Sequence, residues 1–242
     1  IDLNIDRVEL PEKFQLKDEK DTTLHLLADH LSESQICYHA ANTIVRIKRA
    51  LQITSCLEFD LVVEEDELFI YHPPNKNINF TLDELFDFTS ETKSLWIDAK
   101  NINIPSNCNT LYKKIKDLYL HQQQSLVEFP SNTPIDNFRS ANINVSYYIS
   151  NDDINNCYIN LIESNKSCKN LIDKVSLINK KKIFNNISFD YKFSKILKRF
   201  NFKPTNLRLN TWHINFDEVK DLDLNQYNLV IPYNSSHNKN TL

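Results

Sequence analysis

Short apolar segments alternate with helical segments along most of the chain, and this alternation limits the folds open to it. Apolar runs of strand length lie at residues 36–38, 57–63, 67–71, 95–98, 125–129, 143–149, 183–189, 206–212 and 228–232. Segments with helical periodicity or a helix-start signal lie at residues 43–52, from 81 onward, and at 109–121, 167–178 and 191–200. Strands alternating with helices are typical of βαβ units and a parallel sheet. About eight such units favour a (β/α)8 TIM barrel of the α/β class, with an open doubly wound sheet as the alternative.

The length of the chain suits a single barrel domain. It has 242 residues, of which 41% are hydrophobic and 25% charged, the composition of a globular protein with a sizeable core. We find no internal repeat and no long linker. The expected organisation is a leading segment at residues 1–35, with one helix near 20–33, followed by one TIM-barrel domain at residues 36–242.

The charge balance argues against two classes of partner. A net charge of −4 gives no support to binding of nucleic acid or of a membrane surface. No stretch approaches the roughly 18 apolar residues of a transmembrane helix, and the start of the chain lacks the apolar region of a signal peptide. Residue 1 is Ile, as it would be if a leader had been removed. We expect no nucleic-acid partner and no transmembrane segment.

The cysteines suggest a reducing compartment. There are five, an odd number, and none form a CxxC pair. Neither a disulfide framework nor a zinc site is expected from this pattern. Cys37 and Cys56, near adjacent predicted strands, are expected to be inert buried thiols. The predicted location is the cytoplasm.

The sequence contains neither glycine nor methionine. Glycine averages about 7% of residues, so about 17 are expected in a chain this long. Turns and helix ends need residues that tolerate a positive φ, and asparagine meets that need only in part. We therefore interpret the sequence as one from which glycines and methionines are missing, and expect an intact mass above that of the written residues. A mass equal to that of the written residues would contradict this interpretation.

Charged residues interrupt two of the apolar strands. Residues i and i+2 of a strand share a face, so Glu58 and Asp60 point to one side, and Asp98 and Lys100 repeat this arrangement. In a barrel the apolar face packs on the helices, so these polar side chains project inward near the carboxyl ends of their strands, where barrel active sites lie. Three carboxylates that converge there would repel one another without a cation. Oxygen ligands favour Mg²⁺ or Ca²⁺, so we predict one divalent cation bound by Glu58, Asp60 and Asp98.

Two histidines are expected at the same barrel mouth. His39 follows the first predicted strand, and His72 follows the run after the second. Two imidazoles beside a metal-bound phosphate suit general acid–base catalysis near neutral pH. One would deprotonate the attacking oxygen and the other would protonate the leaving oxygen, while the metal and Lys100 would offset charge on the phosphoryl oxygens.

These residues resemble the PI-PLC-like phosphodiesterase superfamily, specifically the glycerophosphodiester phosphodiesterases and the related sphingomyelinase D and menorin groups. The family pattern is a histidine after the first strand, an Asn-Thr motif, E-x-D on the second strand, and a second histidine. The matching positions are His39, Asn42-Thr43, Glu58-x-Asp60 and His72. The resemblance covers residues 36–100 best, and it implies a metal-dependent barrel phosphodiesterase.

Later motifs extend the resemblance. "IDAK" is similar to the next strand's acid-x-Lys motif, which implies a third metal ligand at Asp98 and a phosphate-facing lysine at Lys100. "ISFD" at 187–190 and "NTWHI" at 210–214, with Trp212, look like late-strand motifs of the glycerophosphodiesterases. The residues expected to bind substrate are Asn42, Lys100, Glu128 and Trp212.

The chain departs from the glycerophosphodiesterase pattern beside the first histidine. That pattern has Arg-Gly after the histidine and Glu before Asn-Thr, where this chain has Ala40 and Ala41. The "H-x-x-N" and "HPP" motifs are more similar to the menorin and sphingomyelinase D groups. This points to a larger phosphodiester, such as a lipid head group or a glycan-linked phosphodiester, with a neighbouring hydroxyl attacking to give a cyclic phosphate.

Several alternatives stay open. Glu128 either contacts substrate or pairs with a lysine, and Trp212 either packs on substrate or belongs to the core. The alternative function is a catalytically silent barrel that acts as a binding or scaffolding module. The presence of both histidines and all three acids favours the enzyme.

Overall fold

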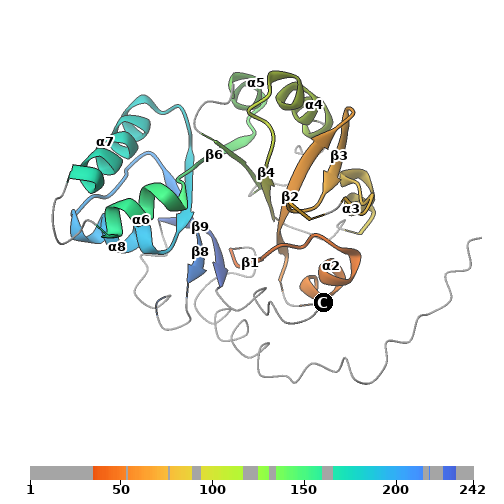
Figure 1. The fold of residues 1–242 in the computed structure, drawn as a ribbon, viewed down its shortest axis with the longest axis horizontal. Coiled ribbons are helices and arrows are strands. Elements are labelled where there is room, and N and C mark those ends of the chain that lie inside the picture. Colours follow the sequence, from red (N-terminus) through yellow and green to blue (C-terminus); the bar gives the residue numbers. More distant parts are fainter. Residues whose placement is uncertain are drawn as a thin grey trace, which may run out of the picture.

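A computed structural model of the chain gives its fold (Figure 1). The residues it describes are 35–52, 54–75, 77–88, 94–116, 125–130, 135–159, 166–214, 218 and 226–232. The helix expected near residues 20–33 lies outside these ranges, as does nearly all of the leading segment 1–35. The division of the chain at residue 35 therefore stays a prediction.

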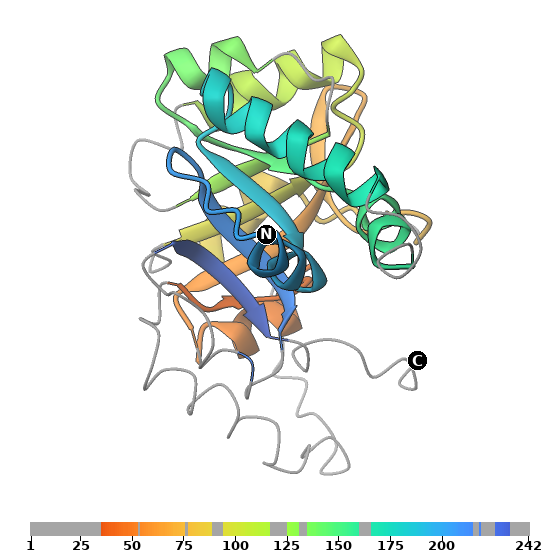
Figure 2. The same cartoon turned by 90° about the vertical axis from the view of Figure 1, so that its left-hand side faces the viewer.

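Eight parallel strands form the wall of a nearly closed barrel (Figure 2). In order around the barrel they are β1 (Cys37–Tyr38), β2 (Cys56–Glu64), β4 (Ser94–Ala99), β5 (Leu126–Phe129), β6 (Asn144–Tyr148), β7 (Asn186–Asp190), β8 (Arg208–Ile214) and β9 (Tyr227–Pro232). The two end strands meet through a parallel bridge between Ile36 and Val230, where the Val230 N–H donates to the Gln35 carbonyl over 2.8 Å. The predicted (β/α)8 barrel is confirmed, and the open doubly wound sheet is excluded.

One strand, β3 (Glu67–Ile70), lies outside the barrel wall. It pairs antiparallel with the second half of β2, so that the two strands form a hairpin. The turn between them consists of Glu65 and Asp66, both with positive φ. The predicted strand at 67–71 is therefore present, but as a hairpin arm. The chain that leaves it carries His72.

Helices lie around the outside of the strands (Figure 1). They are α2 (Ile44–Ala50), α3 (Leu82–Phe88), α4 (Pro105–Ile115), α5 (Asp136–Ser140), α6 (Asn151–Ile159), α7 (Lys166–Lys181) and α8 (Lys192–Arg199). The sequence did not predict α5 or α6, because α5 has only five residues and α6 is rich in Asn and Asp. Among the described residues, none of these helices combines the length and apolar character needed to cross a bilayer.

Local capping explains where two helices begin. The Thr43 side chain accepts a hydrogen bond from the Arg46 N–H over 3.3 Å at the start of α2. At the start of α3, the Thr81 N–H donates to Glu84 Oε2 over 2.8 Å, and the Glu84 N–H donates to Thr81 Oγ1 over 3.2 Å. This reciprocal pair is a capping box, and it accounts for the helix-start signal found from residue 81 onward. It starts α3 soon after the chain leaves the hairpin.

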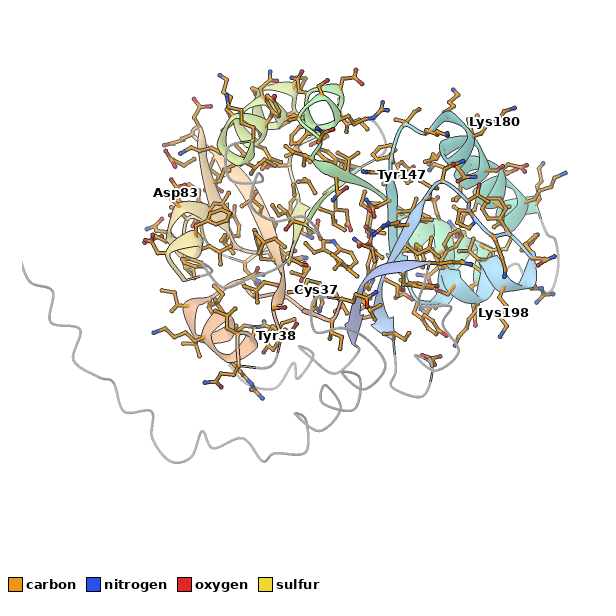
Figure 3. The ribbon with its side chains drawn as sticks, turned by 180° about the vertical axis from the view of Figure 1, so that it is seen from behind. Cys37, Tyr38, Asp83, Tyr147, Lys180 and Lys198 are labelled. Atoms are coloured by element: carbon orange, nitrogen blue, oxygen red, sulfur yellow. A yellow bond between two sulfur atoms is a disulfide. The ribbon has the colours of Figure 1, made fainter. Side chains whose placement is uncertain are left out.

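The barrel wall separates two apolar clusters. The larger lies between the strands and the helices and includes Phe59, Ile97 and Phe189. The smaller comes from side chains on the opposite face of the strands: Cys37, Cys56, Trp96, Leu126, Trp212, Leu229 and Ile231. In Figure 3, Cys37 lies among the strands, whereas Lys180 and Lys198 are on the outer helices. Three residues of this inner cluster, Trp96, Trp212 and Ile231, also line the cavity at the barrel mouth.

Two disulfides correct the expectation drawn from the cysteines. Cys37 and Cys56 are bonded to each other between β1 and β2, and Cys157 is bonded to Cys168 between α6 and α7. The expectation of inert thiols at Cys37 and Cys56 was wrong, because the parallel register places them as direct partners although 19 residues separate them in sequence. Cys108 is buried and takes part in neither disulfide. The argument from reduced cysteines to a cytoplasmic location therefore no longer holds.

Eight described residues have positive φ: Ala40, Glu65, Asp66, Asn79, Asn142, Lys182, Asn201 and His213. Three are asparagines, which tolerate this conformation, but for other residues it costs roughly 1–2 kcal/mol. The interpretation that glycines and methionines are missing from the written sequence stays a prediction. Two of the eight, Ala40 and His213, line the cavity described next.

Candidate functional site

A cavity of about 410 Å³ opens at the carboxyl ends of the barrel strands. All nine residues predicted from the sequence to form a site line it: His39, Asn42, Glu58, Asp60, His72, Asp98, Lys100, Glu128 and Trp212. Eight further lining residues were not predicted: Ala40, Arg46, Asn75, Trp96, Tyr148, Asn151, His213 and Ile231. The structure thus brings the predicted residues together, while their catalytic and binding roles stay predictions.

Three carboxylates converge at the base of the mouth. Glu58 and Asp60 come from β2, and Asp98 comes from the paired strand β4, where it is the register partner of Asp60. One oxygen of each lies within 4.8 Å of the others. Glu58 and Asp60 are buried and Asp98 is partly exposed. These oxygens form a donor set that hard divalent cations such as Mg²⁺ and Ca²⁺ prefer.

The electrostatics of this cluster also fit a cation. Burial, together with the charges of Asp60 and Asp98, raises the pKa of Glu58 well above its usual value. The pKa of Asp98 is raised as well, mainly by burial. Ionised carboxylates crowded in this way are destabilised unless positive charge reaches them. The cluster therefore suits a bound divalent ion.

Lys100 supplies part of that charge. Its Nζ lies 2.7 Å from Asp60 Oδ1 and donates a hydrogen bond to Asp98. Burial acts to lower the pKa of Lys100, but the two carboxylates raise it overall. A single ammonium leaves the charge of three carboxylates incompletely balanced. Lys100 thus borders the candidate metal site directly, and its predicted role of facing a phosphate stays a prediction.

The loop after β1 is held to β2 by hydrogen bonds to Glu58 and Asp60. The Ala40 N–H donates to Glu58 Oε2 over 2.5 Å, and the Ala41 N–H donates to the Glu58 carbonyl over 2.7 Å. The left-handed conformation of Ala40, with φ of 51°, belongs to this tight approach. Asn42 donates to Asp60 Oδ2 over 2.6 Å and accepts from the Asp60 N–H over 2.9 Å. Asn42 thus orients an acidic residue, and its predicted contact with substrate stays a prediction.

Glu128, on β5, is a fourth acidic residue that lines the cavity, and it is buried. It is the register partner of Asp98 and accepts a hydrogen bond from Trp96 Nε1 over 3.0 Å. Burial and the charge of Asp98 raise its pKa to about 8, although a hydrogen bond from Ser188 opposes this. Its contacts are therefore with a tryptophan and a serine, and a contact with substrate stays a prediction.

Three histidines line the cavity. His39 Nε2 lies 3.7 Å from Glu58 Oε2, and the exposed His72 reaches the rim from the segment after β3. His213, on β8, was not predicted as a site residue. Its Nδ1 lies 2.9 Å from Asp190 Oδ2, and its ring meets the His39 ring edge-on, with 6.2 Å between centroids. The "NTWHI" and "ISFD" motifs had marked these two strands without indicating the pair.

Aromatic rings form one wall of the cavity. Tyr148 stacks on Trp212 with 5.7 Å between ring centroids, and Trp96 meets Trp212 edge-on at 6.0 Å. Burial and the charge of Glu128 raise the pKa of Tyr148 to about 12. Trp212 is at once part of the inner apolar cluster and a lining residue, so the two sequence interpretations of it are compatible.

Comparisons with known proteins show similarity at the level of structure. No family model and no curated protein matches the chain. Among solved structures, it is similar to a phosphodiesterase from Oleispira antarctica, determined in complex with the product sn-glycerol-3-phosphate. The two share 13% sequence identity with a TM-score of 0.53, and the match covers 83% of this chain and 94% of that one. At this identity, the similarity establishes the fold.

Proposed function

We propose that this chain is a metal-dependent phosphodiesterase whose active site is the cavity at the barrel mouth. The observation that carries the proposal is the meeting of Glu58, Asp60 and Asp98 with the imidazole of His39 in one cavity. The similar phosphodiesterase from Oleispira antarctica, whose product is a phosphate ester, supports the same class of reaction.

We assign two tasks to the residues of the cavity: some offset negative charge on the substrate, and others transfer protons. A divalent cation, when bound by the three carboxylates, offsets negative charge on the phosphoryl oxygens. Lys100 adds a second positive charge at the same place. We assign acid–base catalysis to His39 and His72, which both line the cavity.

The proposed reaction exchanges one phosphorus–oxygen bond for another. The attacking oxygen belongs to water or to a neighbouring hydroxyl of the substrate, and it loses its proton to one imidazole as it bonds to phosphorus. The other imidazole begins protonated and gives its proton to the leaving oxygen as the bond between that oxygen and phosphorus breaks. Water as nucleophile gives hydrolysis, whereas a substrate hydroxyl gives a cyclic phosphate. The proposed substrates are small phosphodiesters, lipid head groups or glycan-linked phosphodiesters.

A metal-supplemented screen tests the proposal. The purified chain would be assayed with Mg²⁺ or Ca²⁺ against glycerophosphodiesters, phosphodiester lipids and glycan-linked phosphodiesters, with EDTA as the metal-free condition. We expect turnover of at least one class that EDTA abolishes. Glu58→Gln should weaken metal binding by calorimetry at least about tenfold, without unfolding, because it removes one of three mutually repelling carboxylates.

Glu64→Gln is the matched control, because Glu64 lies on the same strand but bonds Tyr71 and Asn77 away from the cavity. It should bind metal as the parent does. One observation favours the silent-barrel alternative: the Lys100 ammonium already lies between Asp60 and Asp98. A parent chain that neither binds Mg²⁺ or Ca²⁺ nor turns over any of these substrates would establish that alternative.

A further inference from the structure

Arg46 brings a guanidinium to the cavity from the first turn of α2. It lines the cavity together with His39 and Ala40, and the sequence had not predicted it as a site residue. The helix begins after Thr43, whose side chain accepts a hydrogen bond from the Arg46 N–H. This cap fixes the backbone of Arg46 beside the loop that follows β1.

A positive residue is unfavourable at this position of a helix. The same position in α3, three residues after the capping threonine, is Glu84, whose carboxylate accepts hydrogen bonds from Thr81. Arg46 cannot accept such a bond, and its charge lies at the positive end of the helix dipole. Local helix chemistry therefore disfavours an arginine here. Residues that break a local rule in this way concentrate at functional sites.

Neutral groups hold the guanidinium. Its Nη2 donates to the His39 carbonyl over 3.0 Å, and its Cζ lies 5.9 Å from the centre of the Tyr38 ring. A guanidinium has five N–H donors. Within the part of the chain that the structure describes, the His39 carbonyl is the one acceptor that these donors bond, and no carboxylate pairs with Arg46.

The other positive side chain of the cavity differs in this respect. The Lys100 ammonium contacts both Asp60 and Asp98, so its charge is offset by carboxylates. Arg46 keeps further donors, and no described carboxylate offsets its charge. It is therefore suited to bind an anion that enters the cavity.

The geometry of a guanidinium matches a phosphoryl group in particular. Two of its N–H bonds are parallel and can reach two oxygens of one phosphate at once. A phosphodiester carries its negative charge on two such oxygens, those outside the ester bonds. The contacts with His39 and Tyr38 already restrict the Arg46 side chain, so less conformational entropy is lost when an anion binds.

We propose that Arg46 is a substrate-binding residue whose guanidinium donates hydrogen bonds to the non-ester phosphoryl oxygens of a phosphodiester in the cavity. The inference rests on the proposed function for the identity of the anion. It deepens that function by giving the phosphoryl group a partner on α2, separate from the three carboxylates and Lys100.

Calorimetry with inorganic phosphate, at saturating Mg²⁺, tests the inference on the intact chain. We expect Arg46→Ala to weaken phosphate binding at least about tenfold and to leave Mg²⁺ affinity unchanged. Arg46→Lys should weaken it less, because the charge stays and the paired donors are lost. Lys48→Ala is the matched control, since Lys48 is an exposed positive residue of the same helix that does not line the cavity. It should bind phosphate as the parent does.

Two results in a folded Arg46→Ala variant would overturn the inference. The first is a phosphate affinity equal to that of the parent. The second is an equal loss of Mg²⁺ and phosphate affinity, which would show that Arg46 only supports the loop that carries His39. If this variant does not fold, Arg46→Gln takes its place, because its amide can still donate to the His39 carbonyl. The same weakening is expected of it, and the same results would overturn the inference.

The metal-supplemented screen separates this inference from the proposed function. A parent chain that binds no phosphate but turns over a phosphodiester would overturn the inference alone. Weakened phosphate binding in Arg46→Ala, in a chain that turns over no phosphodiester, would keep Arg46 as a phosphate-binding residue and remove the proposed function. A parent chain that neither binds phosphate nor turns over any substrate would overturn both.

Discussion

Asn42 and Asp60 exchange two hydrogen bonds across 18 positions of sequence. The amide of Asn42 donates to the Asp60 carboxylate, and its oxygen accepts from the Asp60 backbone N–H. One side chain thus fixes both the strand and the direction of a carboxylate that borders the candidate metal site. Residues that orient metal ligands in this way affect metal affinity without touching the ion.

Replacement of Asn42 by Ala should therefore weaken Mg²⁺ or Ca²⁺ binding about 10- to 100-fold. Asn101→Ala is a matched control, because Asn101 also makes two hydrogen bonds to one residue farther along β2: it accepts from the Val63 N–H and donates to the Val63 carbonyl. Both variants should lose stability, but only the first should lose metal affinity in a calorimetric titration. Equal metal affinity in the two would show that Asn42 does not orient a ligand.

Glu128 should make the stability of the metal-free protein depend on pH. Its pKa is about 8 in the folded chain, against about 4.3 for an exposed Glu. The folded state thus holds a proton that the unfolded state releases between these values, so this group's contribution to stability is full below about pH 4.5 and is lost as the pH rises to about 8. Glu128→Gln removes this titration and keeps an acceptor for Trp96.

Urea unfolding in EDTA at pH 5 and pH 8 measures the effect. Relative to the variant, the parent should lose on the order of a few kcal/mol between the two pH values. A parent and variant whose free energies of unfolding change in parallel would contradict a raised pKa at Glu128.

The two predicted acid–base histidines should be separable from metal binding. His39→Ala and His72→Ala should each lower phosphodiesterase activity about 10²–10⁴-fold, while metal affinity survives because the carboxylates supply the ligands. The rate should rise and fall with pH in the parent, since one imidazole must be neutral and the other protonated. Each variant should lose one limb of that profile.

The double variant His39→Ala/His72→Ala should be little worse than the poorer single variant, because the two groups act as a unit. Undiminished turnover in both single variants, on a substrate that the parent converts, would exclude these histidines from the mechanism.

The cysteine pairing gives a chemical test of the fold. All five cysteines lie in the described ranges: four form two disulfides, and Cys108 is outside them. Thiol titration in denaturant should detect one thiol before reduction and five after it, and none before reduction in Cys108→Ser. Reduction should cost about 3 kcal/mol for each of the two disulfides, given loops of these lengths. Five thiols in the unreduced chain, protected from air during purification, would restore the prediction of inert thiols.

Features that depend on neighbouring residues were determined by the sequence itself. The alternation of Glu58 and Asp60 with apolar neighbours places both carboxylates on one face of β2, and the Thr81–Glu84 pair starts α3. The spacing of strands and helices was enough to predict the barrel. These features follow from short-range geometry, in which the period of a strand and the first turn of a helix set where side chains point.

Features that depend on register were decided by the tertiary structure. The Cys37–Cys56 disulfide and the closure of the barrel between Ile36 and Val230 join residues far apart in sequence. The bulge at His213, whose Nδ1 lies near Asp190, exists because β8 has one more residue than β9 between two consecutive paired positions. Hydrogen bonds between strands fix such offsets, and no local pattern records them. The sequence alone predicted nine of the residues that line the cavity, and the closed barrel decided which residues meet there.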